Sequence, residues 1–166
     1  MSRTARTRPT VARIAAVAAV SATPVAVVAQ APAPAASFDL VELCTTETLA
    51  IEDVQNGATS TLDCDWVDPE ELSNRSLLSV VATHYANSGG AGAILDVGGS
   101  CDGSIAFATN DPWNNLISST RQRSCGVIKH FDNINLTGDN EAHDGAGGTL
   151  LNLSSMDNRA SSVGYA

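Results

Sequence analysis

Two short stretches of the chain concentrate side-chain oxygens at the start of a strand-like run. The first is DPWNNLISST at 111–120, and the second is SMDNRASSV at 155–163. Asn-Asn and Asp-Asn pairs are typical of turns, and the residues that follow them are typical of a strand. Amide, carboxylate and hydroxyl oxygens are ligands that Ca²⁺ prefers, and a turn also exposes carbonyls that no ladder uses. The chemistry indicated is therefore coordination of a hard cation.

The two stretches belong to a longer internal repeat. In YANSGGAG (85–92) and FDNINLTG (131–138) an aromatic residue is followed seven residues later by a glycine. Further along, NNLISS (114–119) aligns with DNRASS (157–162). The offsets of 46 and 43 residues make each unit just over 40 residues long. A duplicated four-stranded unit is the way in which a β-sandwich of two Greek keys would be built.

This pattern resembles the calcium-binding Greek-key motif of the βγ-crystallin superfamily, in which (Asn/Asp)-(Asn/Asp)-x-x-(Ser/Thr)-Ser follows the aromatic and the glycine. Two copies make one domain, and the resemblance covers residues 80–166. It implies an all-β fold, a β-sandwich of two Greek-key motifs. The chain departs from the family where an aromatic usually stands two residues before the glycine, because Gly90 and Leu136 occupy those positions.

The resemblance also implies two calcium sites, each held between the two copies. The implied ligands come from both signatures and from the carbonyls after the two aromatics: Asn114, Asn115, the Leu116 carbonyl and Ser118; Asp157, Asn158, the Arg159 carbonyl and Ser161; and the carbonyls of Ala86 and Asp132. Only one of the ligand side chains is charged, so we expect weak binding. Without an ion, Asn and Ser at such a corner would only satisfy the turn backbone.

The first 36 residues are expected to be a secretory signal peptide. Residues 1–13 carry four arginines and no acid, an Ala/Val-rich stretch follows at 14–30, and small-residue A-x-A sites come next. The apolar stretch is short and is interrupted by Thr23 and Pro24, which argues against a membrane anchor. We therefore expect a secreted, extracellular protein.

Charge restricts the expected partners. Without residues 1–36 the chain has 5 basic and 18 acidic residues, a net charge near −13. Such a surface repels nucleic-acid phosphates and anionic membranes, so neither is expected as a partner. It favours multivalent cations.

The cysteines predict a disulfide framework. All four, Cys44, Cys64, Cys101 and Cys125, lie beyond the expected signal peptide. An even count in a secreted chain of this size predicts two disulfides, for which three connectivities exist. We favour the sequence-local pairs 44–64 and 101–125. A metal site is disfavoured because no C-x-x-C or Cys/His spacing occurs.

Residues 37–79 form an acidic N-terminal segment with 10 of the 18 acids. Within it, Asn56-Gly57 lies between two strand-like runs, which predicts a β-hairpin closed by the disulfide between Cys44 and Cys64. We expect this hairpin to be separate from the sandwich.

The rest of the chain shows strands and turns. DPEEL at 68–72 is typical of one helical turn. Short β-rich runs, separated by Gly, Asn and Asp at spacings typical of a sandwich or barrel, then occupy 79–85, 93–97, 104–109, 116–120, 126–131, 148–153 and 161–166.

The function expected first is a calcium-binding extracellular module that calcium stabilises. The first alternative is an inhibitor of extracellular proteases, because some small secreted metalloproteinase inhibitors with two disulfides resemble single crystallin-type domains. The glycine-rich stretch 139–148 weakens this alternative, since a flexible loop is not preorganised for binding. A cell-wall or toxin-like module is the third. An enzyme is not expected, because GGSCDG at 98–103 does not match G-x-S-x-G and the three histidines are scattered.

Overall fold

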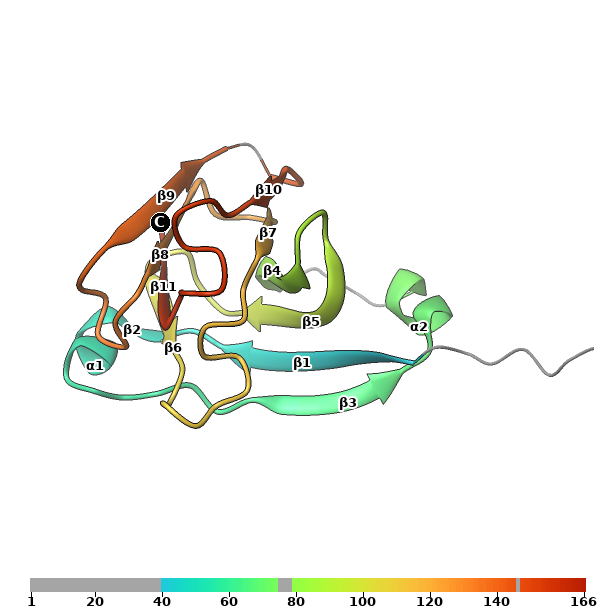
Figure 1. Ribbon diagram of the computed structural model, residues 1–166, viewed down its shortest axis with the longest axis horizontal. Helices are drawn as coiled ribbons and strands as arrows, with labels where there is room; N and C mark the ends of the chain where they lie inside the picture. The colour runs from blue at the N-terminus through green and yellow to red at the C-terminus, as the bar shows by residue number, and fades with distance from the viewer. Residues whose placement is uncertain (1–39, 75–78, 146) are drawn as a thin grey trace, which may run out of the picture. The chain divides into compact units, whose positions relative to one another are not determined.

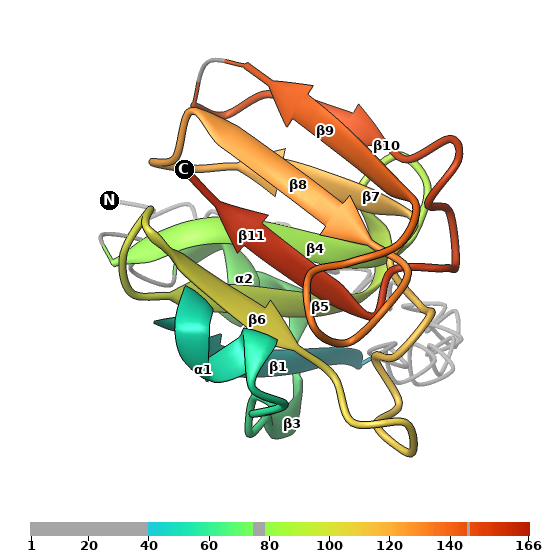
Figure 2. The ribbon, with the colours of Figure 1, turned by 90° about the vertical axis from the view of Figure 1, so that its left-hand side faces the viewer.

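The computed structural model describes residues 40–74, 79–145 and 147–166, which form a mostly β protein with two sheets. One sheet has six strands in the order β10-β7-β4-β5-β1-β3, and the other has five in the order β2-β6-β11-β8-β9 (Figure 1; Figure 2). The signal peptide expected at 1–36 lies outside the described residues. No helix in the described part of the chain is long and apolar enough to cross a membrane.

The elements follow the chain in the order β1 Val41–Glu47, β2 Leu49–Ala50, α1 Ile51–Gln55, β3 Asp63–Val67, α2 Pro69–Asn74, β4 Val80–Asn87, β5 Ala91–Gly98, β6 Gly103–Ala106, β7 Ser119–Gln122, β8 Val127–Phe131, β9 Asn140–Asp144, β10 Leu150–Asn152 and β11 Ser162–Tyr165. Each expected strand run overlaps a strand, and α2 confirms the helical turn expected at 68–72. Strand β9 lies in the stretch expected to be a flexible loop, so that expectation is wrong for its residues.

The strands from β4 to β11 form two units with the same arrangement. β4, β5 and β7 lie in the six-stranded sheet, whereas β6 lies in the other sheet. Correspondingly, β8, β9 and β11 lie in the five-stranded sheet, whereas β10 lies in the six-stranded one. The two units therefore exchange their third strands, and each sheet contains strands from both.

The acidic segment is part of the six-stranded sheet. β1 pairs in parallel with β5 and antiparallel with β3, while β2 pairs with β6 of the other sheet. The expectation of a hairpin separate from the sandwich is therefore wrong, because β1 takes up the hydrogen bonds at the edge of β5. Both expected disulfides, Cys44–Cys64 and Cys101–Cys125, are confirmed.

The Asn56-Gly57 pair ends a helix and does not form the expected hairpin turn. The N–H of Asn56 donates to the Glu52 carbonyl at 3.0 Å, and that of Gly57, at φ +94°, donates to the Val54 carbonyl at 3.0 Å. A glycine takes this left-handed conformation just past a helix end without steric cost. Asn56 itself is at φ −86°, so the pair does not have the positive φ at both residues that a two-residue Asn-Gly hairpin turn needs.

The hydrophobic core draws on both sheets. Leu95 and Val97 of β5 are fully buried with Ile105 of β6, Ile128 of β8 and Val163 of β11. Burial of each such side chain contributes about 1.5–3 kcal/mol to folding. The core therefore joins the two sheets.

A chain of buried polar groups also crosses from sheet to sheet. His84 Nδ1 lies 2.8 Å from Thr120 Oγ1, and His84 Nε2 lies 2.8 Å from the Tyr165 hydroxyl. Thr120 Oγ1 is also 3.0 Å from His130 Nε2. Burial, and secondly the neighbouring His130, lower the pKa of His84. Burial and His143 together lower the pKa of His130 to about 3, although Glu141 opposes this shift. Both imidazoles are therefore neutral at neutral pH.

These two histidines make stability depend on pH. Their folded-state pKa values lie below the unfolded value of 6.5. The unfolded chain consequently binds protons that the folded chain does not, and stability falls as the pH drops below 6.5. In that range each histidine lowers the free energy of unfolding by about 1.4 kcal/mol per pH unit. Urea denaturation should therefore show that the free energy of unfolding falls by roughly 2–3 kcal/mol between pH 7.5 and 5.5. His130→Gln should about halve this slope. An unchanged slope in that variant would contradict the assignment.

Candidate metal centre

The two signature turns are bonded to each other. Asn115 and Asn158 both have left-handed backbones, with φ of 62° and 53°. The N–H of Asn115 donates to the Ala160 carbonyl, and that of Asn158 donates to the Ile117 carbonyl, both at 3.0 Å. Asparagine adopts the left-handed region more readily than most residues other than glycine. Each turn is thus held by the backbone of the other copy.

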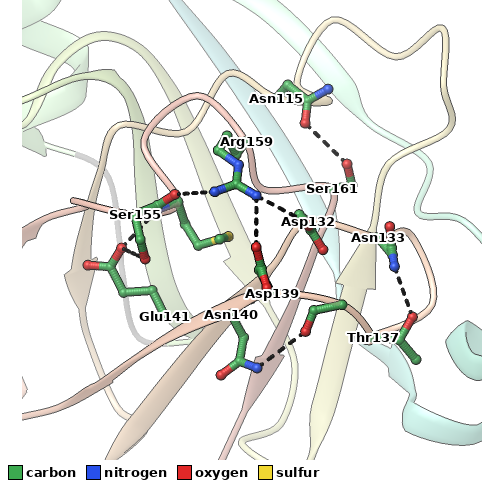
Figure 3. Close-up of polar contacts among 12 residues, drawn as sticks. Asn115, Asp132, Asn133, Thr137, Asp139, Asn140, Glu141, Ser155, Arg159 and Ser161 are labelled. Carbon is green, nitrogen blue, oxygen red and sulfur yellow. Dashed lines mark hydrogen bonds and ion pairs between the residues drawn. The ribbon is translucent and has the colours of Figure 1, made fainter.

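The side chains of the two turns face each other in the same reciprocal way. Ser161 Oγ donates to Asn115 Oδ1 at 3.2 Å (Figure 3), and Ser118 Oγ donates to Asn158 Oδ1 at 3.3 Å. The N–H of each serine donates to the carbonyl of the aromatic residue in its own copy, at 3.0 Å for Ser118 and 2.8 Å for Ser161. Each serine therefore lies between its own aromatic strand and the asparagine of the other copy.

These contacts gather eight of the predicted ligand residues into two clusters. The first cluster is Asn114, Asn115, Asp132 and Ser161, of which Asn114, Asp132 and Ser161 line one polar hollow. The second cluster is Ala86, Ser118, Asp157 and Asn158, where Asn158 Nδ2 donates to Asp157 Oδ1 at 3.1 Å. Ala86 is assigned to this cluster only by its place in the chain, next to Tyr85, whose carbonyl accepts from the Ser118 N–H. Each cluster contains residues of both copies.

The remaining two predicted ligands occupy equivalent turns. The N–H of Leu116 donates to the Trp113 carbonyl at 3.2 Å, and that of Arg159 donates to the Met156 carbonyl at 3.0 Å. The role of the Leu116 and Arg159 carbonyls as ligands stays a prediction.

The oxygen spacing fits neighbouring ligands of one calcium ion. Two oxygens at 2.3–2.6 Å from Ca²⁺ and about 80–90° apart lie roughly 3.0–3.7 Å from each other. The Asn115–Ser161 and Asn158–Ser118 oxygen pairs, at 3.2 and 3.3 Å, fall in that range. As O–H···O bonds they are long, because such bonds usually measure about 2.7–2.8 Å. The spacing of each pair is thus compatible with two oxygens that contact one cation.

The first cluster also holds two buried oxygens, Asn114 Oδ1 and Asp132 Oδ1, without a hydrogen-bond partner among the described residues. Asn114 Oδ1 is buried and accepts no hydrogen bond from any described residue, while its Nδ2 donates to the Thr109 carbonyl at 3.4 Å. Buried polar atoms usually have a partner, and an unsatisfied one calls for a bound water or ion. A cation in the hollow would satisfy these oxygens.

Charge distinguishes the two clusters. The guanidinium Nη2 of Arg159 lies 3.2 Å from Asp132 Oδ2 and 3.3 Å from Asp139 Oδ2 (Figure 3). The repeat places uncharged Leu116 and Ala86 at the positions of Arg159 and Asp132 in the first copy. Sequence reasoning gave Asp132 and Arg159 only carbonyl roles and missed their side-chain pairing. The signal for it was a pair of opposite charges in one copy alone.

A second pair of serines holds the hairpins beside the clusters. Ser162 Oγ donates to the Asn133 carbonyl at 2.5 Å and accepts from the Leu136 N–H at 3.1 Å. Ser119 makes the equivalent bonds in the first hairpin, at 2.6 and 3.0 Å, the second from the N–H of Gly90. Gly90 and Leu136 are both left-handed, with φ of 76° and 60°. Sequence reasoning missed this role, although both signatures end in serine.

A carboxylate anchors the turn that leads into the second signature. Glu141 accepts hydrogen bonds from the backbone N–H groups of Ser154 and Met156 and from the hydroxyls of Ser154 and Ser155. Partial burial acts to raise the pKa of Glu141, but the hydrogen bonds outweigh it and lower the pKa to about 2. Glu141 thereby connects β9 to the segment just before Asp157.

Glu42, Cys44 and Cys64 also place potential metal ligands close together. The two sulfurs form a disulfide, so they are not available to a metal.

No protein-family model, curated protein or solved structure matches this chain. The internal repeat and the geometry of the two clusters are therefore the observations that bear on function.

We expect Ser162→Ala to lower the free energy of unfolding by about 1–3 kcal/mol, because it removes the hydroxyl that accepts from the left-handed Leu136 N–H, its one acceptor within the described part of the chain. Urea denaturation measures this effect. Ser88→Ala is the control, an exposed serine whose loss should change stability by less than about 0.5 kcal/mol. Equal stabilities of the two variants would show that the Ser162 hydroxyl does not hold the hairpin.

Proposed function

We propose that this protein is a secreted calcium-binding module of the βγ-crystallin type, in which Ca²⁺ at two sites stabilises the fold. The observation that carries the proposal is the reciprocal spacing of 3.2 and 3.3 Å between the asparagine and serine oxygens of opposite copies. The unpartnered Asn114 oxygen in the first cluster supports it.

The strand arrangement and the repeat support the crystallin assignment. Two units of four strands exchange their third strands between two sheets, as two interlocked Greek keys would. The aligned serines, asparagines and left-handed turns of the two units make the same hydrogen bonds. Two disulfides are typical of an oxidising compartment, which agrees with secretion.

The ligand chemistry indicates weak sites. Each cluster has one carboxylate, Asp132 in the first and Asp157 in the second, and the other groups are amides, hydroxyls and carbonyls. Because affinity rises with the number of charged ligands, dissociation constants of roughly 10⁻⁵–10⁻³ M are expected, as in extracellular modules. In the first cluster the Arg159 guanidinium offsets part of the Asp132 charge.

Calcium should raise the melting temperature over a chelated sample by on the order of 10 °C for each occupied site. Calcium at a hundredfold over Kd stabilises the folded state by about 2.7 kcal/mol per site, and a small domain gains roughly 4–8 °C per kcal/mol. Magnesium should raise the melting temperature much less, because it requires shorter, octahedral contacts. Calorimetric scans with calcium, magnesium and chelator measure this. Identical scans with calcium and chelator would refute the proposal.

Adjacent serines provide matched variants for this measurement. Ser161→Ala removes an oxygen of the first cluster and should weaken calcium binding there about tenfold while changing the chelated melting temperature little. Ser162→Ala should lower the melting temperature with and without calcium by the same amount.

Ser161→Arg should abolish about half of the calcium-induced rise in melting temperature, because the arginine guanidinium would replace a ligand at one of the two sites.

One observation favours protease inhibition as a second candidate function. The stretch around β9 is not the flexible loop expected, since β9 pairs with β8 along its whole length and Glu141 anchors it. A preorganised segment binds at lower entropic cost. If the protein is an inhibitor, an equimolar amount should suppress hydrolysis of a peptide substrate by thermolysin. Full thermolysin activity with a large excess of the protein would contradict the hypothesis that it inhibits metalloproteases.

A further inference from the structure

Strand β3 ends the six-stranded sheet, and its outer edge is open (Figure 1). Across residues 40–74, 79–145 and 147–166, no strand pairs with this edge. Four of the five residues of β3 are exposed. An open edge presents unpaired N–H and C=O groups, which are a template for a further strand.

The disulfide shows which backbone groups face outward. Cys44 and Cys64 lie directly opposite each other, with their Cα atoms 4.0 Å apart. Such close approach is typical of a non-hydrogen-bonded antiparallel pair, in which the N–H and C=O groups point away from the partner strand. Hydrogen-bonded and non-hydrogen-bonded pairs alternate along the ladder, so Trp66, two residues further on, also points its N–H and C=O away from β1. The outer edge therefore presents the backbone groups of Cys64 and Trp66.

Apolar side chains flank this edge on both faces of the sheet. Trp66 is 67% exposed, the largest fraction among the exposed large hydrophobic residues described. On the opposite face, Val67 lines a hollow with Leu43 and Leu72, and the acids Asp68, Glu70 and Glu71 also line it. Because the side chains of an added strand alternate between faces, such a strand would meet an apolar contact on each.

Charge selects among possible partners. Residues 40–74 include nine acidic residues and no basic one. Asp63 and Asp65 lie on β3 itself, and Glu42 lies opposite Trp66. A second copy of this edge would place like charges opposite each other, which is destabilising. A basic strand would place its charges next to these carboxylates.

We propose that the outer edge of β3 binds an extended basic segment of a partner protein, which adds to the six-stranded sheet as a further strand. The backbone of Cys64 and Trp66 supplies the hydrogen bonds, the indole of Trp66 covers one face of the added strand, and the acids select lysine or arginine. This mode of recognition is β-strand addition. It does not depend on calcium.

The test uses the full chain and the peptide acetyl-Lys-Val-Lys-Leu-Lys-Val-Lys-amide. Trp113 is buried and Trp66 is exposed, so acrylamide quenching of fluorescence reports mainly on Trp66. The peptide should protect Trp66 from acrylamide and bind with Kd on the order of 10–100 µM by calorimetry. Binding should weaken several-fold when salt rises from about 0.05 to 0.5 M.

Peptide controls separate strand addition from charge attraction. A peptide with the same charges but N-methylated at alternate residues cannot donate along one edge, and should bind at least about tenfold more weakly. A peptide with glutamate in place of lysine should not bind. Equal affinity of the N-methylated peptide would overturn the proposal, since charge alone would then explain binding.

Protein variants locate the site. Asp65→Lys should weaken binding of the basic peptide about tenfold, whereas Asp144→Lys, on the other acidic edge strand β9, should leave it unchanged. Equal losses would overturn the proposal by showing an effect of net charge alone.

Sedimentation tests whether the free protein self-associates through this edge. Self-association of the free protein that Trp66→Ala abolishes would assign the edge to a second copy and overturn the basic partner.

Discussion

The reciprocal bonding of the two signature turns is the constraint on which the rest of the structure depends. Each turn is the segment where the chain leaves one sheet and enters the other, from β6 to β7 in the first unit and from β10 to β11 in the second. The N–H groups of Asn115 and Asn158 bond each crossing segment to the other. Because the third strands are exchanged, separating the two turns would disrupt both sheets at once.

The same crossing explains why polar side chains gather there. A segment between two sheets cannot use the hydrogen bonds of either ladder, so its backbone groups need other partners. Ser119 and Ser162 satisfy the hairpins, and the asparagine and serine oxygens of opposite turns come to face each other. Under the proposed function, calcium binding and the joining of the two sheets are one linked equilibrium, because an ion held by both turns binds only the folded chain.

The N-terminal segment determines which strand forms one edge of the six-stranded sheet. Without β1 and β3, the six-stranded sheet would end at β5, whose residues from Ile94 to Gly98 are buried. With them, the open edge moves to a strand that carries Asp63 and Asp65. Charged side chains on an edge strand restrict which strands can add to it. The disulfide between Cys44 and Cys64 ties this new edge to the sheet.

The sequence by itself determined the all-β class, the strand runs from residue 79 onward and the helical turn of α2, because these depend on local patterns. It favoured the two local disulfides among three connectivities, and the structure confirms them. Only the tertiary structure decided that β1 pairs with β5, that Asn56-Gly57 ends a helix, that β9 is a strand, and that Asn115 faces Ser161. An Asn-Gly sequence is compatible with a hairpin turn or with a helix end, and at this helix end only Gly57 takes the left-handed conformation. The polar residues of β9 become a strand because β8 offers a free edge. Local sequence does not contain the partner that a backbone group will meet, since that partner comes from residues distant in the chain.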